Sequence, residues 1–139
     1  MAGDEEAGAC VFQLVESLDA GPVYRSMMVP IGSTTTAGEL LDELARTATP
    51  LVIDTLKDIE AGVEPTPQSV EGVTIAPQIH PGDVRIAVTS AAEEIDHLVR
   101  GASPAPGAWA ELNDKRFKIL RTRCLEAGDR VPSTVATAQ

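Results

Sequence analysis

The segment from residue 63 to residue 83 limits most strongly how this chain can fold. It holds four prolines and shows no sustained helical or alternating hydrophobic period. Proline has no backbone N–H and its ring clashes with the preceding helical turn, so neither a helix nor a central strand can run through such a segment. We therefore expect a linker that crosses the surface, with an extended run at "VTIAPQI" (73–79), between two structured segments.

Composition narrows the kind of core that the two segments can build. The chain has 139 residues, of which 43% are hydrophobic and only 3% aromatic, so the core must consist of Leu, Val, Ile and Ala. No apolar run approaches the ~20 residues of a membrane span. The N-terminus is acidic and lacks the basic-then-apolar order of a signal peptide. We expect a cytoplasmic protein with no membrane contact.

The first segment begins with a predicted β-hairpin. The runs "ACVFQLV" (9–15) and "GPVYRSMMVPI" (21–31) are rich in strand-forming residues. Between them "ESLDAG" (16–21) reads as a turn, with Asp19, Gly21 and Pro22 as its turn residues. The connection is too long for a two-residue hairpin loop.

Residues 33–62 are predicted to be helical. Thr36 and Glu39 have the spacing of a capping box, in which hydroxyl and carboxylate each satisfy the other's free backbone N–H. Pro50 should kink or restart the helix, and Gly62 should end it. The predicted apolar face consists of Leu40, Leu44, Leu51, Ile53, Leu56 and Ile59.

The second segment combines a helix with strands. Residues 90–101 form the clearest local pattern, with a predicted capping box at Ser90 and Glu93 and a stop at Gly101. A short strand or extended piece is expected at 83–88. Two strand-like runs follow the turn "SPAPGAW", at 108–112 and 116–123.

Charge is distributed unevenly along the chain. Residues 1–99 hold 17 acidic and four basic residues, whereas residues 100–139 hold four acidic and seven basic ones. The basic residues gather in "KRFKILRTR" (115–123), a strip that could bind RNA phosphates. A solvated strand explains this strip equally well. The candidate RNA-binding residues are Lys115, Arg116, Lys118, Arg121 and Arg123.

The cysteines and histidines give no sign of a metal site or a nucleophile. Cys10 and Cys124 lie far apart, which excludes a disulfide framework or a zinc knuckle and favours two reduced, partly buried thiols. His80 and His97 are isolated from each other and from both cysteines, so each is expected on a surface or in a loop. We expect no bound metal.

Several stretches together resemble the methionyl-tRNA formyltransferase family, in order and spacing, from residue 2 to about residue 125. The motif Leu-Asp-x-Gly-Pro, at 18–22 here, occurs throughout the folate-dependent formyltransferases. The second half resembles the opening of the family's tRNA-binding C-terminal domain and favours the tRNA enzyme over its sugar-nucleotide and purine-pathway relatives. The stretches that carry the resemblance are "AGDEEAG", "LDAGPVY", "TAGELLDELA", "TIAPQI" and "AAEEIDHLVRGASPAPGAWAELNDKRFKILR".

The resemblance implies an α/β fold in three parts. Residues 1–62 would be the C-terminal part of a Rossmann-like formyltransferase domain, with a β-hairpin and a helix. Residues 63–83 would be a linker, and residues 84–139 the start of a small, incomplete β-barrel domain that binds tRNA. The implied reaction transfers a formyl group from 10-formyltetrahydrofolate to the methionyl amino group of initiator tRNA, in translation initiation.

The resemblance also assigns site residues. The family motif Asp-x-x-Thr-Gly falls on residues 4–8, so Asp4 takes the place of the catalytic aspartate. A carboxylate beside a histidine can hold the orientation and protonation state of the imidazole during acyl transfer. The small residues Ala2 and Gly3, with Glu5 and Glu6, would form the loop that holds the folate.

The sequence departs from the family pattern in ways that bear on activity. Ala7 replaces the motif threonine, and no Asn-x-His pair followed by Ser-Leu-Leu-Pro occurs in the 139 residues. We therefore expect a family fragment or truncated product that is inactive by itself. The tail "LEAGDRVPSTVATAQ" (125–139) is not expected to complete the barrel. The alternatives are a sugar-nucleotide formyltransferase and a non-catalytic remnant.

Overall fold

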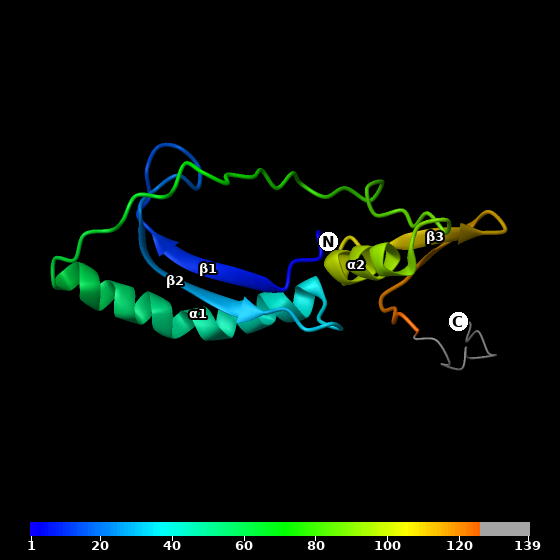
Figure 1. Cartoon of the computed structure of the whole chain (residues 1–139), viewed down its shortest axis with the longest axis horizontal. Coiled ribbons are helices and arrows are strands. Elements are labelled where there is room, and N and C mark those ends of the chain that lie inside the picture. Colours follow the sequence, from blue (N-terminus) through cyan, green and yellow to red (C-terminus); the bar gives the residue numbers. More distant parts are fainter. Residues whose placement is uncertain (126–139) are drawn as a thin grey trace.

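The computed structural model describes residues 1–125 and has the predicted α/β character (Figure 1). The tail predicted not to complete a barrel lies, from residue 126 on, outside the described residues. No helix in the described range is both long and apolar enough to cross a membrane. The elements are β1 (Glu6–Phe12), β2 (Val23–Pro30), α1 (Ala37–Glu60), α2 (Ala92–Ala102), β3 (Trp109–Leu112) and β4 (Lys115–Lys118).

Strands β1 and β2 form the predicted antiparallel hairpin, although β1 lies at residues 6–12 and not at the predicted 9–15, and α1 runs along it (Figure 1). The hydrogen-bonded register pairs Glu6 with Pro30 at one end and breaks at a bulge after Val11. Val29 of β2 is buried. The Arg25 guanidinium donates to the Asp58 carboxylate of α1 at 2.9 Å and joins helix to hairpin. The hydrogen bond to Asp58, together with the Asp58 charge, raises the pKa of Arg25, and the same hydrogen bond lowers the pKa of Asp58.

The start and the end of α1 agree with the predicted capping box and with the predicted stop at Gly62. The middle of the helix, at Pro50, differs from the prediction of a restart. Both reciprocal hydrogen bonds of the Thr36–Glu39 capping box are present, and Gly62, with a φ of +76°, follows the C-cap. Of the two outcomes predicted at Pro50, the helix restart does not occur, because α1 runs through this residue without interruption. Proline removes a single backbone hydrogen bond here, and packing on the hairpin along the helix outweighs that loss.

The apolar face predicted for α1 is only partly correct. Leu40, Leu44 and Leu51 are half-buried, but Ile53, Leu56 and Ile59 are largely exposed. Thr55, which sequence reasoning passed over, is 1% exposed, and its hydroxyl donates to the carbonyl of Leu51 at 2.8 Å. Side chains four residues apart share a helix face, so the face toward the hairpin continues from Leu51 through Thr55.

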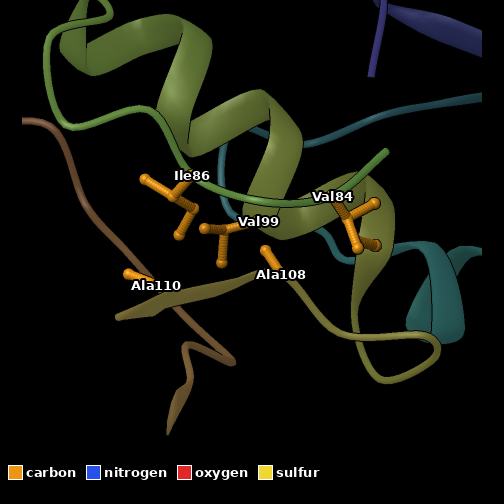
Figure 2. Close-up of a cluster of buried hydrophobic side chains, with 6 residues drawn as sticks. Val84, Ile86, Val99, Ala108 and Ala110 are labelled. Atoms are coloured by element: carbon orange, nitrogen blue, oxygen red, sulfur yellow. The ribbon is translucent and has the colours of Figure 1, made fainter. Parts of the chain in front are cut away.

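The main hydrophobic cluster lies in the second segment, between α2, β3 and residues 84–86 (Figure 2). It is built from aliphatic side chains, as the composition required. Ile95 and Leu98 pack against its edge. Its members are Val84, Ile86, Val99, Ala102, Ala108 and Ala110.

Helix α2 begins and ends later than predicted. Ala91 is the N-cap and no side chain caps it, so the predicted Ser90–Glu93 capping box is wrong. Ser90 instead donates its N–H to the carbonyl of Ala87 and closes a turn. Gly101 lies inside the helix rather than at its end. A Cβ there would come within 2.1 Å of the Met1 side chain, so packing explains this glycine.

The remaining strand predictions are correct in position but too long. Residues 83–88 contribute a single parallel bridge between Arg85 and Trp109. Strand β4 ends at Lys118, although the N–H of Ile119 still reaches the carbonyl of Ala108 at 2.8 Å. The proline-rich segment returns past the hairpin (Figure 1) and is attached at Thr66, which exchanges two backbone hydrogen bonds with Val23.

Candidate functional site

The predicted catalytic residue Asp4 and a second aspartate, Asp19, lie at opposite ends of the hairpin. Asp4 precedes β1, whereas Asp19 lies in the connection that follows it. Strand β1, which lies between them, has seven residues, and at ~3.3 Å per residue its two ends are roughly 20 Å apart. Figure 1 shows the N-terminus beside α2 and the connection at the far end of β1. One small active site therefore cannot contain both aspartates.

Asp4 lines a small pocket at the end of the hairpin near α2. The pocket holds about 240 Å³, and Thr35, His97 and Arg100 also line it. Gly3 has a φ of +88°, and a Cβ on it would lie 3.0 Å from the Cε1 atom of His97. His97 is thus half-buried against the N-terminal loop and not the isolated surface residue that the sequence predicted. Nothing in the sequence spacing could show this contact, because Gly3 and His97 are 94 positions apart.

The other residues expected to hold the folate surround Asp4 and, like Asp4, are open to solvent. Ala2, Glu5 and Glu6 are exposed. The backbone carbonyl of Glu5 accepts a hydrogen bond from the Ile31 N–H at 2.7 Å, and Glu6 is the first residue of β1. The loop backbone is therefore fixed while its carboxylates stay free.

The connection at the other end of β1 has an unusual backbone. Asp19 has a φ of +53°, which non-glycine residues rarely adopt and which is enriched at functional sites as well as in turns. The amide of Gln68 supports it by donating to the carbonyls of Asp19 and Gly21, at 2.8 and 2.7 Å. Gly21 packs so tightly that a Cβ would lie 1.7 Å from the carbonyl oxygen of Gln13.

A large open cavity adjoins this connection. It measures about 1150 Å³ and lies between residues 18–22 and the linker at 67–76. Its walls include the exposed side chains of Val70 and Ile75, and Asp19 lines it as well. Sequence reasoning treated Asp19 as a turn residue only. The signal that could have singled it out is its place in the Leu-Asp-x-Gly-Pro motif.

The structure divides the predicted basic strip. Lys115, Arg116 and Lys118 lie on β4 and are exposed, while Arg121 and Arg123 follow the strand. Arg121 forms an ion pair with Glu39 at the start of α1. The backbone N–H of Thr36, with the Arg121 guanidinium second, lowers the pKa of Glu39 to about 2. Arg121 thus has a structural partner that the sequence pattern did not reveal.

A second polar network joins the two segments beside this ion pair. Arg100 donates to the Asp96 carboxylate at 2.7 Å and to the carbonyl of Thr35 at 3.1 Å. Thr122 donates its hydroxyl to the other Asp96 oxygen at 2.8 Å, and Asp96 is only 8% exposed. The charge of this nearly buried carboxylate is therefore compensated within the network. The start of α1, helix α2 and the chain after β4 are held together.

The described residues contain no cluster of three or more His, Cys, Asp or Glu side chains that could hold a metal ion. Cys10 and Cys124 are both free thiols. They are exposed, so the prediction of partly buried thiols is wrong. Cys10 lies on β1 opposite Ser26, on the face of the hairpin turned away from buried Val29.

Comparison with known proteins gives a consistent set of relatives. Residues 78–139 match the model of the formyl transferase C-terminal domain. The match continues to residue 139, so the resemblance does not end near residue 125 as expected. All 139 residues align at 86% identity with 44% of the methionyl-tRNA formyltransferase of Cutibacterium acnes. The chain thus spans less than half the length of that relative.

Solved structures agree on the fold. HypX from Aquifex aeolicus in complex with tetrahydrofolic acid aligns with a TM-score of 0.69 and 22% identity, over 82% of this chain and 20% of HypX. The methionyl-tRNA formyltransferase from Clostridium thermocellum aligns with a TM-score of 0.62 and 17% identity, over 91% of this chain and 54% of that protein. The fold of this chain is therefore shared, over the aligned residues, with these two proteins.

Proposed function

Because this chain belongs to the methionyl-tRNA formyltransferase family over the residues it spans, we propose that it contributes to formyl transfer onto initiator tRNA. The donor is 10-formyltetrahydrofolate and the acceptor is the methionyl amino group. The observation that carries the proposal is the 86% identity along all 139 residues. The fold shared with a tetrahydrofolate-bound protein supports the folate donor. Translation initiation places the reaction in the cytoplasm.

The reaction sets out what the chain must supply. The amine must lose a proton as it attacks the formyl carbon, and the tetrahedral oxyanion must be stabilised. A carboxylate next to a histidine does this indirectly, by holding the imidazole in the orientation and charge state that the proton transfer needs. We assign this role to an aspartate of the first segment.

Two aspartates compete for this role. The register of the family motif assigns it to Asp4, and that assignment stays a prediction. The backbone geometry favours Asp19, whose left-handed conformation is supported by Gln68 beside the larger cavity. Asp19 also belongs to the Leu-Asp-x-Gly-Pro motif, which occurs in folate-dependent formyltransferases that act on different acceptors. A residue in this shared motif is expected to serve the step that these enzymes have in common, which is transfer from the formyl donor.

The second segment is proposed to contact the tRNA. Two observations support this assignment. Residues 78–139 match the formyltransferase C-terminal domain, and β4 carries exposed lysine and arginine side chains. Residues 1–62 would then serve the chemistry, and residues 63–83 would connect the two. This division follows the break in structure that the prolines impose.

The two aspartates can be tested side by side in a chain extended by the preceding residues of the Cutibacterium acnes relative. We expect Asp19→Asn to lower the formylation rate about 10²–10⁴-fold, the usual contribution of positioned acid–base catalysis, and to leave tRNA affinity unchanged. Glu5→Gln and Glu6→Gln serve as controls and should change the rate little. If only Asp4→Asn lowers the formylation rate, the catalytic carboxylate is Asp4, as the family motif implied. Full activity in both aspartate variants would contradict the proposed carboxylate role.

A further inference from the structure

Three side chains of the second segment form an ordered basic and aromatic cluster. The Arg116 guanidinium lies 4.0 Å from the centre of the Trp109 ring, and that of Arg85 lies 5.4 Å from it. The indole N–H donates to the carbonyl of Pro81 at 2.6 Å. A ring fixed to the backbone in this way orders the two guanidiniums over it before any ligand arrives.

The pairing of β3 and β4 places this cluster on one face of the hairpin. Trp109 lies opposite Lys118 and Glu111 lies opposite Arg116, so these four side chains share a face. Ala110 points to the other side, into the hydrophobic core. Trp109 also packs against the edge of this core, while Glu111, Arg116 and Lys118 on its face of the hairpin are exposed to solvent.

The charge balance of this face is positive. Arg85, Arg116 and Lys118 carry three positive charges, and the single acid among them is Glu111, which accepts a hydrogen bond from Arg85 at 2.9 Å. The chain as a whole has a formal net charge of −10, so this face is a local exception. Arg121 also has a carboxylate partner, Glu39, but it follows β4 and does not belong to this face of the hairpin.

We propose that Arg85, Trp109 and Arg116 form a phosphate-binding platform for the RNA backbone of the substrate, with Lys118 at its edge. The proposal rests on the proposed function and adds Arg85 and Trp109, which the basic strip did not include. It also removes Arg121 from the RNA contacts. Guanidiniums ordered on an aromatic ring present their N–H groups as a fixed fork, which matches the geometry of phosphate oxygens.

Trp109 is the only tryptophan of the chain and reports on its own surroundings. The test titrates the 139-residue chain with deacylated initiator tRNA over a series of KCl concentrations and follows Trp109 fluorescence. Arg85→Gln and Arg116→Gln should each weaken binding about tenfold at low salt. Each should also reduce the slope of log affinity against log salt by about 1. Circular dichroism verifies that the variants are folded.

Matched variants distinguish a specific contribution of the platform from the nonspecific effect of removing any positive charge. Arg46→Gln removes an exposed arginine from α1 and should leave affinity and slope unchanged. Arg116→Lys keeps the positive charge but loses the planar guanidinium with its paired N–H donors. It should therefore have the same salt slope as the unsubstituted chain and a lower affinity for tRNA.

Three outcomes would overturn the inference. Wild-type affinity and slope in Arg85→Gln and Arg116→Gln would exclude the platform while the proposed function stands. A tRNA titration that leaves Trp109 emission unchanged would also exclude it. If the wild-type chain does not bind tRNA at any salt concentration, the platform fails together with the tRNA contact of the second segment in the proposed function.

Discussion

Glu39 connects distant parts of the structure through one carboxylate. It accepts hydrogen bonds from the backbone N–H and the hydroxyl of Thr36, both at 2.9 Å, and it pairs with Arg121, 82 residues further on. These donors favour the ionised form, which is why the pKa of Glu39 falls from its ordinary 4.5 to about 2. A residue that sequence analysis identified as a helix cap therefore also anchors the chain after β4.

The lowered pKa of Glu39 predicts a specific acid sensitivity. A carboxyl group whose pKa is lower in the folded than in the unfolded state stabilises the fold fully above about pH 4.5 and loses this effect as pH falls toward 2. Glu39→Gln should therefore lower the Tm by a few degrees at pH 7 and weaken the dependence of Tm on pH between these values. Thermal unfolding followed by circular dichroism at several pH values measures both effects.

Glu43→Gln, one turn further along α1, is the matched control and should leave the pH dependence unchanged. An acid profile that is identical for Glu39→Gln and the unsubstituted chain would show that the ion pair and cap do not act on stability.

The connection between β1 and β2 requires a glycine at position 21. Gln13 donates its N–H to the carbonyl of Pro22 at 2.9 Å, which brings the two strands together at the position of Gly21. Only a residue without a Cβ fits there, since the contact would be with backbone that cannot rotate away. The same closure holds Asp19 in its left-handed conformation.

Gly21→Ala is accordingly expected to reduce the free energy of unfolding by about 2–3 kcal/mol or more, because the added methyl group forces the strand ends apart. Gly82→Ala is the control, since its Cβ would meet nothing within 4 Å. It should raise the free energy of unfolding by less than about 1 kcal/mol. Urea unfolding of both variants provides the values. Similar stability of Gly21→Ala and Gly82→Ala would mean that the connection adapts at little cost.

At the scale of the whole molecule, the hairpin with α1 and the second segment meet at the start of α1 (Figure 1). The N–H of Gly38 donates to the carbonyl of Ser103 at 3.0 Å, next to the contact of Arg100 with Thr35. The linker reaches the second segment after passing the large cavity. The two ends of the hairpin are thus tied to different partners, one to α2 and one to the linker.

We predict that the 139-residue chain alone shows no formyl transfer to methionyl-tRNA above background. Its one asparagine, Asn113, has a φ of +50° and forms the two-residue turn between β3 and β4 with Asp114, so it is committed to the hairpin. Neither histidine follows it at the spacing that the family's active site uses. An assay with 10-formyltetrahydrofolate and charged initiator tRNA measures this. Turnover that Asp19→Asn abolishes would show that the chain builds a complete site by itself.

The sequence by itself determined the features that depend on neighbours along the chain. The Thr36–Glu39 cap, the helix end at Gly62 and the order of hairpin, helix, linker and helix all follow from hydrogen bonds or patterns within a few residues. The tertiary structure decided the rest. It kept α1 continuous through Pro50, left Ser90 outside α2, and brought Arg85 to Trp109 and Glu39 to Arg121. Such contacts join residues tens of positions apart, and their energy depends on which surfaces meet after folding, which local propensity does not encode.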